Sequence, residues 1–202
     1  AIEAFISVWA TTVASETITI PTQNDTFNAV VDWGDGTTET ITTYNGFTHE
    51  YAAIGEHTIS ITGTFPNIYF NGVGDRLKIK RVTNLGTVGW TSFNGAFRAC
   101  TNLTEFTVGS TDTSSVTDMQ RMFQSCSGLT TVDVSFDTSS VTNMFAMFFG
   151  CIALSSIVGV EDWDITGLNG ISDLSEFLTS GKMTTAQYDN LLINWRAQDP
   201  FN

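Results

Sequence analysis

The sequence predicts a protein in two parts: an all-β sandwich over residues 1–75, and an α/β solenoid of short repeats over residues 76–202 that ends in a helical cap. Three observations predict this fold class. Apolar and polar residues alternate in the first part, a unit of about 25 residues recurs in the second, and all eight Lys and Arg residues follow residue 75. The composition therefore changes where the two parts are expected to meet.

Strands are expected in the first part because every second residue is apolar within residues 17–20, 27–33 and 58–62. This period puts one face of each strand in a core and the other in water. The Gly-Asp-Gly sequence at 34–36 and the Asn-Gly pair at 45–46 are typical of turns. Several short strands separated by such turns indicate a sandwich.

Three short motifs of the first part follow one another along the chain: Val-Asp-Trp-Gly-Asp-Gly at 31–36, Thr-His-Glu-Tyr at 48–51 and Gly-Glu-His-Thr-Ile at 55–59. In these residues the sequence resembles the polycystic-kidney-disease (PKD) type of immunoglobulin-like domain. The resemblance implies an extracellular spacer or adhesive module rather than an enzyme.

The second part is built from a repeat that is clearest around its cysteines. Cys100, Cys126 and Cys151 each stand three residues before a leucine, and the sequence Asp-Thr-Ser-Ser-Val-Thr occurs twice, 25 residues apart. The first half of the repeat has apolar residues at the spacing of a short helix, namely Val116, Met119, Met122, Phe123 and Cys126. The second half, as in residues 129–134, has the Leu-x-x-Val-x-Val spacing of a strand. Elements this short cannot bury themselves alone, so the repeats are expected to stack.

The repeat resembles the leucine-rich repeats of BspA-like bacterial surface proteins. Their signature joins Met-Phe-x-x-Cys-x-x-Leu to Phe-Asp-Thr-Ser-Ser-Val-Thr-x-Met, and it is explicit here in residues 119–154 and weaker over about 85–180. The sequence departs from it at residues 110–111 and 162–164, where longer turns are expected. The resemblance implies a leucine-rich-repeat solenoid on a secreted or cell-surface bacterial protein that adheres to a host, a matrix or a neighbouring cell.

Residues 184–196 have the pattern of a helix that covers the last repeat. Four apolar residues fall on one of its faces, namely Tyr188, Leu191, Leu192 and Trp195. Thr184 or Thr185 can cap its start. A repeat array needs such a terminal unit because its last apolar surface would otherwise be exposed. The alternative interpretation is a helix that binds a partner.

The formal net charge of −13 makes nucleic acid an unfavourable ligand, because the chain would repel phosphates. No apolar run approaches the roughly 20 residues that span a bilayer, so no membrane insertion is expected. The first bases arrive together, as Arg76, Lys78, Lys80 and Arg81, after a segment with nine acids and no base. They fit a solvated strand face, a junction with the acidic first part, or a ligand site.

The candidate ligand residues each have a structural alternative, and no catalytic motif is visible in the sequence. Asp32 and Asp35 could bind calcium, but two Asp residues around a glycine turn more often cap that turn. His49 and His57 are expected to be structural. The three cysteines are expected to be buried thiols, with a disulfide or a metal site as alternatives. Residues 161–164 could hold a cation or a sugar, but a solvated turn is expected.

The expected function is non-enzymatic recognition or adhesion, outside the cell or on a bacterial cell surface. Outward positions of the repeat strands would contact the ligand, namely Glu105, Thr107, Thr131, Asp133, Ser156 and Val158. The expected partner is an extracellular protein or glycan, and no catalytic residue, metal or cofactor is expected. The chain is also expected to belong to a longer surface protein, in which it could alternatively be a spacer or stalk. A catalytic role would need paired ionisable groups in a pocket, and the sequence provides none.

Overall fold

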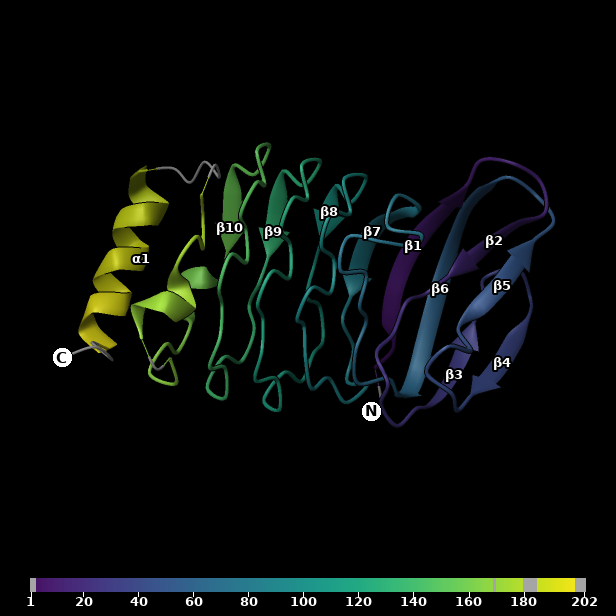
Figure 1. Ribbon diagram of the computed structural model, residues 1–202, viewed down its shortest axis with the longest axis horizontal. Helices are drawn as coiled ribbons and strands as arrows, with labels where there is room; N and C mark the ends of the chain where they lie inside the picture. Colours follow the sequence, from purple (N-terminus) through teal and green to yellow (C-terminus); the bar gives the residue numbers. More distant parts are fainter. Residues whose placement is uncertain (1–2, 169, 180–184, 199–202) are drawn as a thin grey trace.

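The computed structural model describes residues 3–168, 170–179 and 185–198, and over these residues the protein is largely β-sheet with one α-helix. Its elements follow in chain order as β1 (Phe5–Thr11), β2 (Glu16–Thr19), β3 (Asn28–Asp32), β4 (Thr38–Ile41), β5 (Thr48–Tyr51), β6 (Gly55–Thr64), β7 (Ile79–Asn84), β8 (Glu105–Phe106), β9 (Thr131–Asp133), β10 (Ser156–Val158), the 3-10 helices η1 (Val160–Asp162) and η2 (Ile171–Leu174), and α1 (Thr185–Gln198). Figure 1 shows them spread along one long axis, with β2, β4 and β5 toward one end and α1 at the other.

Eight strands form one sheet in the order β10-β9-β8-β7-β1-β6-β3-β4 (Figure 1). Strands β7, β1, β6, β3 and β4 pair antiparallel. Strands β7, β8, β9 and β10 pair parallel, because successive repeats each contribute one strand in the same direction. The pairing of β1 with β7 carries the sheet across residue 75, where the composition changes.

Strands β2 and β5 form a separate antiparallel pair that lies over the antiparallel end of the large sheet (Figure 1). Aromatic rings pack beneath it: the centroid of Phe47 lies 5.2 Å from that of Phe27 and 5.1 Å from that of Phe65. The hydroxyl of Tyr51, on β5, is buried and donates a 2.8 Å hydrogen bond to the carbonyl of Trp33. The alternation within residues 17–20, 27–33 and 58–62 correctly predicted β2, β3 and β6.

The first halves of the repeats are turns, so the short helix expected within residues 116–126 is absent. Alternate amides in these segments donate to the next repeat. The amide of Phe97 bonds to the carbonyl of Met122 at 2.8 Å, and that of Phe123 bonds to Met147 at 2.9 Å. The amides between them close turns within their own repeat. An α-helix cannot form, because it would need every amide to bond four residues back.

Several residues in these turns have a left-handed backbone conformation. Arg121, Ser125 and Ala146 have φ angles of 56°, 62° and 53°, although none of them is glycine. A left-handed conformation costs a non-glycine residue roughly 1–2 kcal/mol. The hydrogen bonds between repeats, together with side-chain burial, must offset that cost.

Equivalent side chains of successive repeats stack inside the molecule. Phe97, Phe123 and Phe148 are fully buried, with ring centroids 5.8 and 5.4 Å apart and planes inclined by 12° and 9°. The apolar spacing in the first half of the repeat thus marks positions that face the core. It does not mark a helix.

The fold class expected from the sequence is wrong. The protein is a largely β-sheet protein with one C-terminal helix, and an α/β leucine-rich-repeat solenoid is not supported, because the described repeats contain strands and turns without an α-helix. An immunoglobulin-like sandwich is not separate from the repeats either, since β1, β3, β4 and β6 belong to the same sheet as β7–β10. The division of the chain at residue 75 stays a prediction.

The helix expected near residues 184–196 is present as α1. Leu191 is buried, and the ring of Trp195 lies 5.6 Å from that of Phe177, in the turns that follow η2. Tyr188 and Leu192, expected on the same apolar face, are about half exposed. Thr184 lies outside the described residues. At 14 residues α1 is too short to cross a membrane, and no other helix in the described ranges could do so.

Candidate functional site

Five of the six residues expected to contact a ligand lie on one face of the parallel part of the large sheet, and Thr107 directly follows β8. We call all six the strand strip: Glu105, Thr107, Thr131, Asp133, Ser156 and Val158. The register aligns Glu105, Thr131 and Ser156 in one row across β8, β9 and β10. Asp133 and Val158 are aligned in the next row. The residues between the rows are buried in the core, namely Phe106, Val132 and Ile157.

The strand strip combines exposed and half-buried side chains. Glu105, Thr131 and Val158 are exposed, and the other three residues are half-buried. The carboxylate of Asp133 caps its own turn, because Oδ1 accepts hydrogen bonds from the amide and the hydroxyl of Ser135 at 3.1 and 2.7 Å. The strip therefore presents hydroxyls, an exposed carboxylate and one aliphatic side chain at the spacing of the strands, which suits a polar ligand lying across them.

Arg81 extends the first row of the strip onto β7, where it is the register partner of Glu105. Its guanidinium forms an ion pair with Glu56 of β6, with 2.5 Å between Nη2 and Oε2. The hydrogen bond from Arg81 lowers the pKa of Glu56, and Glu56 raises the pKa of Arg81. Exposed pairs of this kind contribute little to stability. The main consequence of the pair is that a positive and a negative side chain lie next to the strip.

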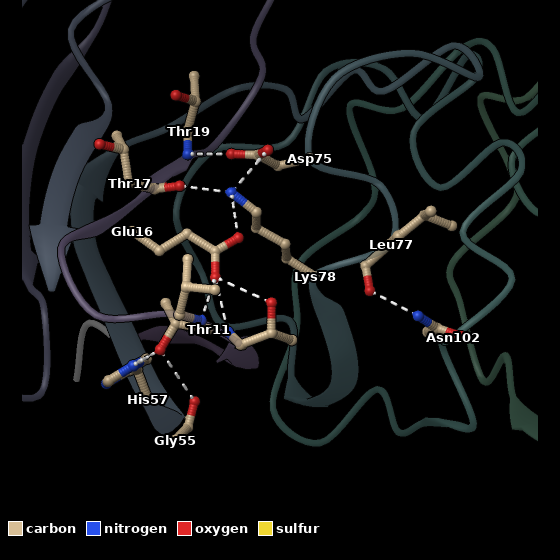
Figure 2. A network of polar contacts seen from close by, with 12 residues as sticks. Thr11, Glu16, Thr17, Thr19, Gly55, His57, Asp75, Leu77, Lys78 and Asn102 are labelled. Atoms are coloured by element: carbon tan, nitrogen blue, oxygen red, sulfur yellow. Dashed lines mark hydrogen bonds and ion pairs between the residues drawn. The ribbon is translucent and has the colours of Figure 1, made fainter. Parts of the chain in front are cut away.

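A second polar cluster surrounds Lys78, and Figure 2 shows its side chain pointing between two acids. The Lys78 Nζ lies 3.1 Å from Glu16 Oε1 and 3.0 Å from Asp75 Oδ1, and it donates a 2.6 Å hydrogen bond to the carbonyl of Thr17. The amide of Thr19 donates to the other oxygen of Asp75 at 2.7 Å. The cluster ties β2 to the segment that leads into β7.

The electrostatics of this cluster follow from its hydrogen bonds. The amide of Thr12, followed by Lys78, lowers the pKa of Glu16 to about 2. Partial burial alone would lower the pKa of Lys78, but its hydrogen bonds to Asp75 and Glu16 outweigh burial and raise that pKa. Glu16 and Lys78 are therefore both charged at neutral pH. Of the three interpretations of the first bases, a junction with the acidic first part is confirmed for Lys78 and Arg81.

The Asp-containing turn between β3 and β4 is held by its own side chains. Oδ1 of Asp32 accepts the amide of Gly34 at 2.9 Å, and Oδ1 of Asp35 accepts the amide of Thr37 at 3.0 Å. The hydroxyl of Thr37 and then His49 lower the pKa of Asp35. The expected turn capping is therefore confirmed.

The two histidines both pack against Tyr51. Nε2 of His49 lies 2.7 Å from Asp35 Oδ2, and its ring lies 4.7 Å from that of Tyr51. The ring of His57 stacks on Tyr51 at 3.6 Å, and its Nε2 lies 2.9 Å from the hydroxyl of Thr11 (Figure 2). Partial burial lowers the pKa of His57 and burial raises that of Tyr51. The structural role expected for both histidines is confirmed.

The three cysteines are free, buried thiols, as expected. Sγ of Cys126 donates to the carbonyl of Phe97 at 3.0 Å, and that of Cys151 donates to Phe123 at 2.9 Å. Burial raises the pKa of Cys151 to about 12 and raises those of Cys100 and Cys126 as well. These thiols are poor nucleophiles for that reason. Among the described residues, no group of three His, Cys, Asp or Glu side chains is placed to hold a metal.

The solvated turn expected at residues 161–164 is found only in part, because residues 161–162 belong to the 3-10 helix η1. Trp163 is buried and its indole donates to the carbonyl of Val134 at 2.7 Å. Asp164 caps the following residues, because its Oδ1 accepts the amide of Thr166 at 2.8 Å. The side chain of Asn194 on α1 donates to the carbonyl of Glu161 at 3.2 Å. This segment therefore connects the last repeat strand to the helix.

The comparisons with known proteins identify one family. Residues 76–191, more than half of the chain, match the family described as "Mycoplasma protein of unknown function, DUF285". No curated protein and no solved structure matches the chain. The resemblances to BspA-like leucine-rich repeats and to PKD domains are thus corrected: the family match is a different one, and the described repeats contain no α-helix.

Proposed function

We propose that this chain, which belongs to the DUF285 family, is a non-enzymatic recognition module that binds an extracellular protein or glycan on its strand strip. The observation that carries the proposal is the register of β8, β9 and β10, which aligns the exposed Glu105 and Thr131 with the half-buried Ser156 on one sheet face. A ligand lying across the strands would meet these side chains at the strand spacing of about 4.8 Å.

The remaining ionisable clusters support recognition over catalysis. Lys78, Glu16 and Asp75 hold one another in a junction, and Asp35 and His49 hold a turn. The thiols are buried and hydrogen-bonded. Each of these groups already has a structural partner, whereas Glu105 and Thr131 project from the sheet.

The proposal includes placement on the surface of a bacterial cell or outside it, as part of a longer surface protein. The family description supports a bacterial setting. Labelling of intact cells with an antibody against this chain tests the placement. Labelling only after the cells are broken would contradict it.

Binding to arrays of matrix proteins and glycans tests recognition directly. The intact chain should bind at least one component, and Thr131→Arg should weaken that binding at least about tenfold, because an added cation and a longer side chain would disrupt the centre of the strip. Ser139→Arg, at an exposed turn outside the strip, is the matched control and should leave binding unchanged. Equal loss in both variants, or no binding by the intact chain, would contradict the proposal.

The sheet that extends along the long axis favours a second candidate, a spacer within a larger surface protein (Figure 1). A spacer would keep its two ends apart without binding anything on the strip. It predicts that Thr131→Arg, in the parent protein, leaves cell attachment unchanged.

A further inference from the structure

The outward face of α1 is apolar at its centre and charged on either side. Ile193 is 65% exposed and Leu192 is 47% exposed. Helix periodicity places Asp189 and Arg196 near Ile193 on the same face, four residues before it and three after. Both charged residues are exposed. Neither takes part in an ion pair among the described residues.

The opposite face of α1 holds the helix against the rest of the protein. Leu191 is buried there, and the side-chain amide of Gln198 donates to the carbonyl of Trp163 at 2.7 Å. Gln198 Oε1 also accepts the amide of Ile165 at 2.7 Å. These contacts fix the rotation of the helix, so the face that carries Ile193 is held outward.

The charges on this face are complementary to those on the same face of a second α1 helix that runs in the opposite direction. If a second α1 packs antiparallel, with a two-fold axis near residues 192 and 193, Asp189 of each copy lies opposite Arg196 of the other. Leu192 and Ile193 then meet at the axis. Ala186 and Ala197, small and exposed on the same side, leave room for a close approach. A two-fold interface requires this kind of self-complementarity.

We infer that α1 is a homodimer contact: two copies of the chain associate through antiparallel α1 helices, with Ile193 at the centre and reciprocal Asp189–Arg196 ion pairs. A single helix pair buries less than the roughly 1,600 Å² of a standard interface. The dimer is therefore a weak one. It would join two sheets at the end far from β2 and β5 (Figure 1), and it does not depend on what the strand strip binds.

Sedimentation equilibrium of the intact chain over about 10 μM to 1 mM tests the inference. The native sequence should move toward a dimer as its concentration rises. Ile193→Glu should remain monomeric, because it places like charges at the axis. Ile152→Glu is the matched control, since Ile152 is 61% exposed on a repeat turn. It should dimerise like the native chain. Circular dichroism should show that each variant keeps the native fold.

A charge exchange tests the antiparallel arrangement itself. Asp189→Arg should weaken the dimer at least about tenfold, because it faces Arg196 of the other copy. The double variant Asp189→Arg/Arg196→Asp should restore the native dissociation constant to within about threefold, since each pair is present again with its charges reversed. A monomeric native chain, a dimer indifferent to Ile193→Glu, or a double variant no better than the single one would each overturn the inference.

Discussion

The N-terminal strands and the repeats enter one sheet by different routes. Strand β1 pairs antiparallel with β6 and β7, which lie about 50 and 75 residues further along the chain. In the repeats, each strand pairs parallel with the equivalent strand about 25 residues away, and a second set of backbone bonds joins the turns. Side-chain alternation specifies the first region, whereas the second also depends on how closely neighbouring backbones approach.

The largest effect is expected from Phe123→Ala, which removes a ring buried between Phe97 and Phe148. It should lower the free energy of unfolding by about 3–5 kcal/mol, because the cavity is enclosed by neighbouring repeats. Urea unfolding followed by circular dichroism measures it. Phe145→Ala is the control, since Phe145 is only half-buried and lies beneath Arg121 at 5.3 Å. Equal losses in the two variants would contradict the stacked core.

Gly128→Ala tests the close approach of the repeats. A Cβ there would lie 2.3 Å from the carbonyl oxygen of Thr101 in the preceding repeat. The backbone must shift, at a cost of about 1–3 kcal/mol. Gly36→Ala is the matched change in the N-terminal region. Its added Cβ meets nothing within 4 Å, and only the φ of 95° opposes it, at about 1 kcal/mol. Thermal unfolding should rank Gly128→Ala as the more damaging change, and the reverse order would show that the repeats are not tightly apposed.

Lys78→Met tests the junction of the two regions. The substitution leaves Glu16 and Asp75 without their shared cation. It should lower the free energy of unfolding by about 1–2 kcal/mol at neutral pH, a value between those of exposed and buried ion pairs. The pKa of Glu16 is lowered in the folded protein, so its stabilising effect is present above its ordinary value of 4.5 and is lost as the pH falls toward about 2. The difference from the native chain in urea unfolding should therefore shrink in acid. A difference independent of pH would contradict this account.

The smallest effect is expected from the titration of His57. Its pKa is lowered in the folded protein, so the unfolded chain binds the proton more readily, and stability should fall as the pH drops below the ordinary value of 6.5. His57→Gln should flatten this part of the pH profile of urea unfolding. A profile unchanged by the substitution would assign the pH dependence to other groups.

Strands β2, β3 and β6 of the N-terminal region could be predicted from the sequence, because apolar and polar residues alternate in them, whereas β1, β4 and β5 were not predicted in this way. The turn caps of Asp32 and Asp35 were also predictable, because each Asp side chain bonds to an amide only two residues away in the same glycine turn. The repeat period and the shared face of Glu105, Thr131 and Ser156 also followed from sequence spacing. Whether anything binds there stays a prediction.

The destination of the backbone hydrogen bonds could not be predicted. Val116, Met119 and Phe123 face the core at a helix-like spacing, but that spacing does not reveal that alternate amides bond to the next repeat. Which face of α1 packs against the protein could not be predicted either, because apolar residues lie on more than one side of the helix. Leu191 is buried while Leu192 and Ile193 are exposed, and the polar contacts of Gln198 fix that choice.

Hydrogen-bond scalar couplings across the repeat turns, measured by NMR on the deuterated protein, distinguish backbone bonding between repeats from helical repeats. Couplings are expected from the amide of Phe97 to the carbonyl of Met122 and from that of Phe123 to Met147. Couplings from these amides to carbonyls four residues earlier would instead show helical repeats, and the repeat-to-repeat backbone bonds described above would then be wrong.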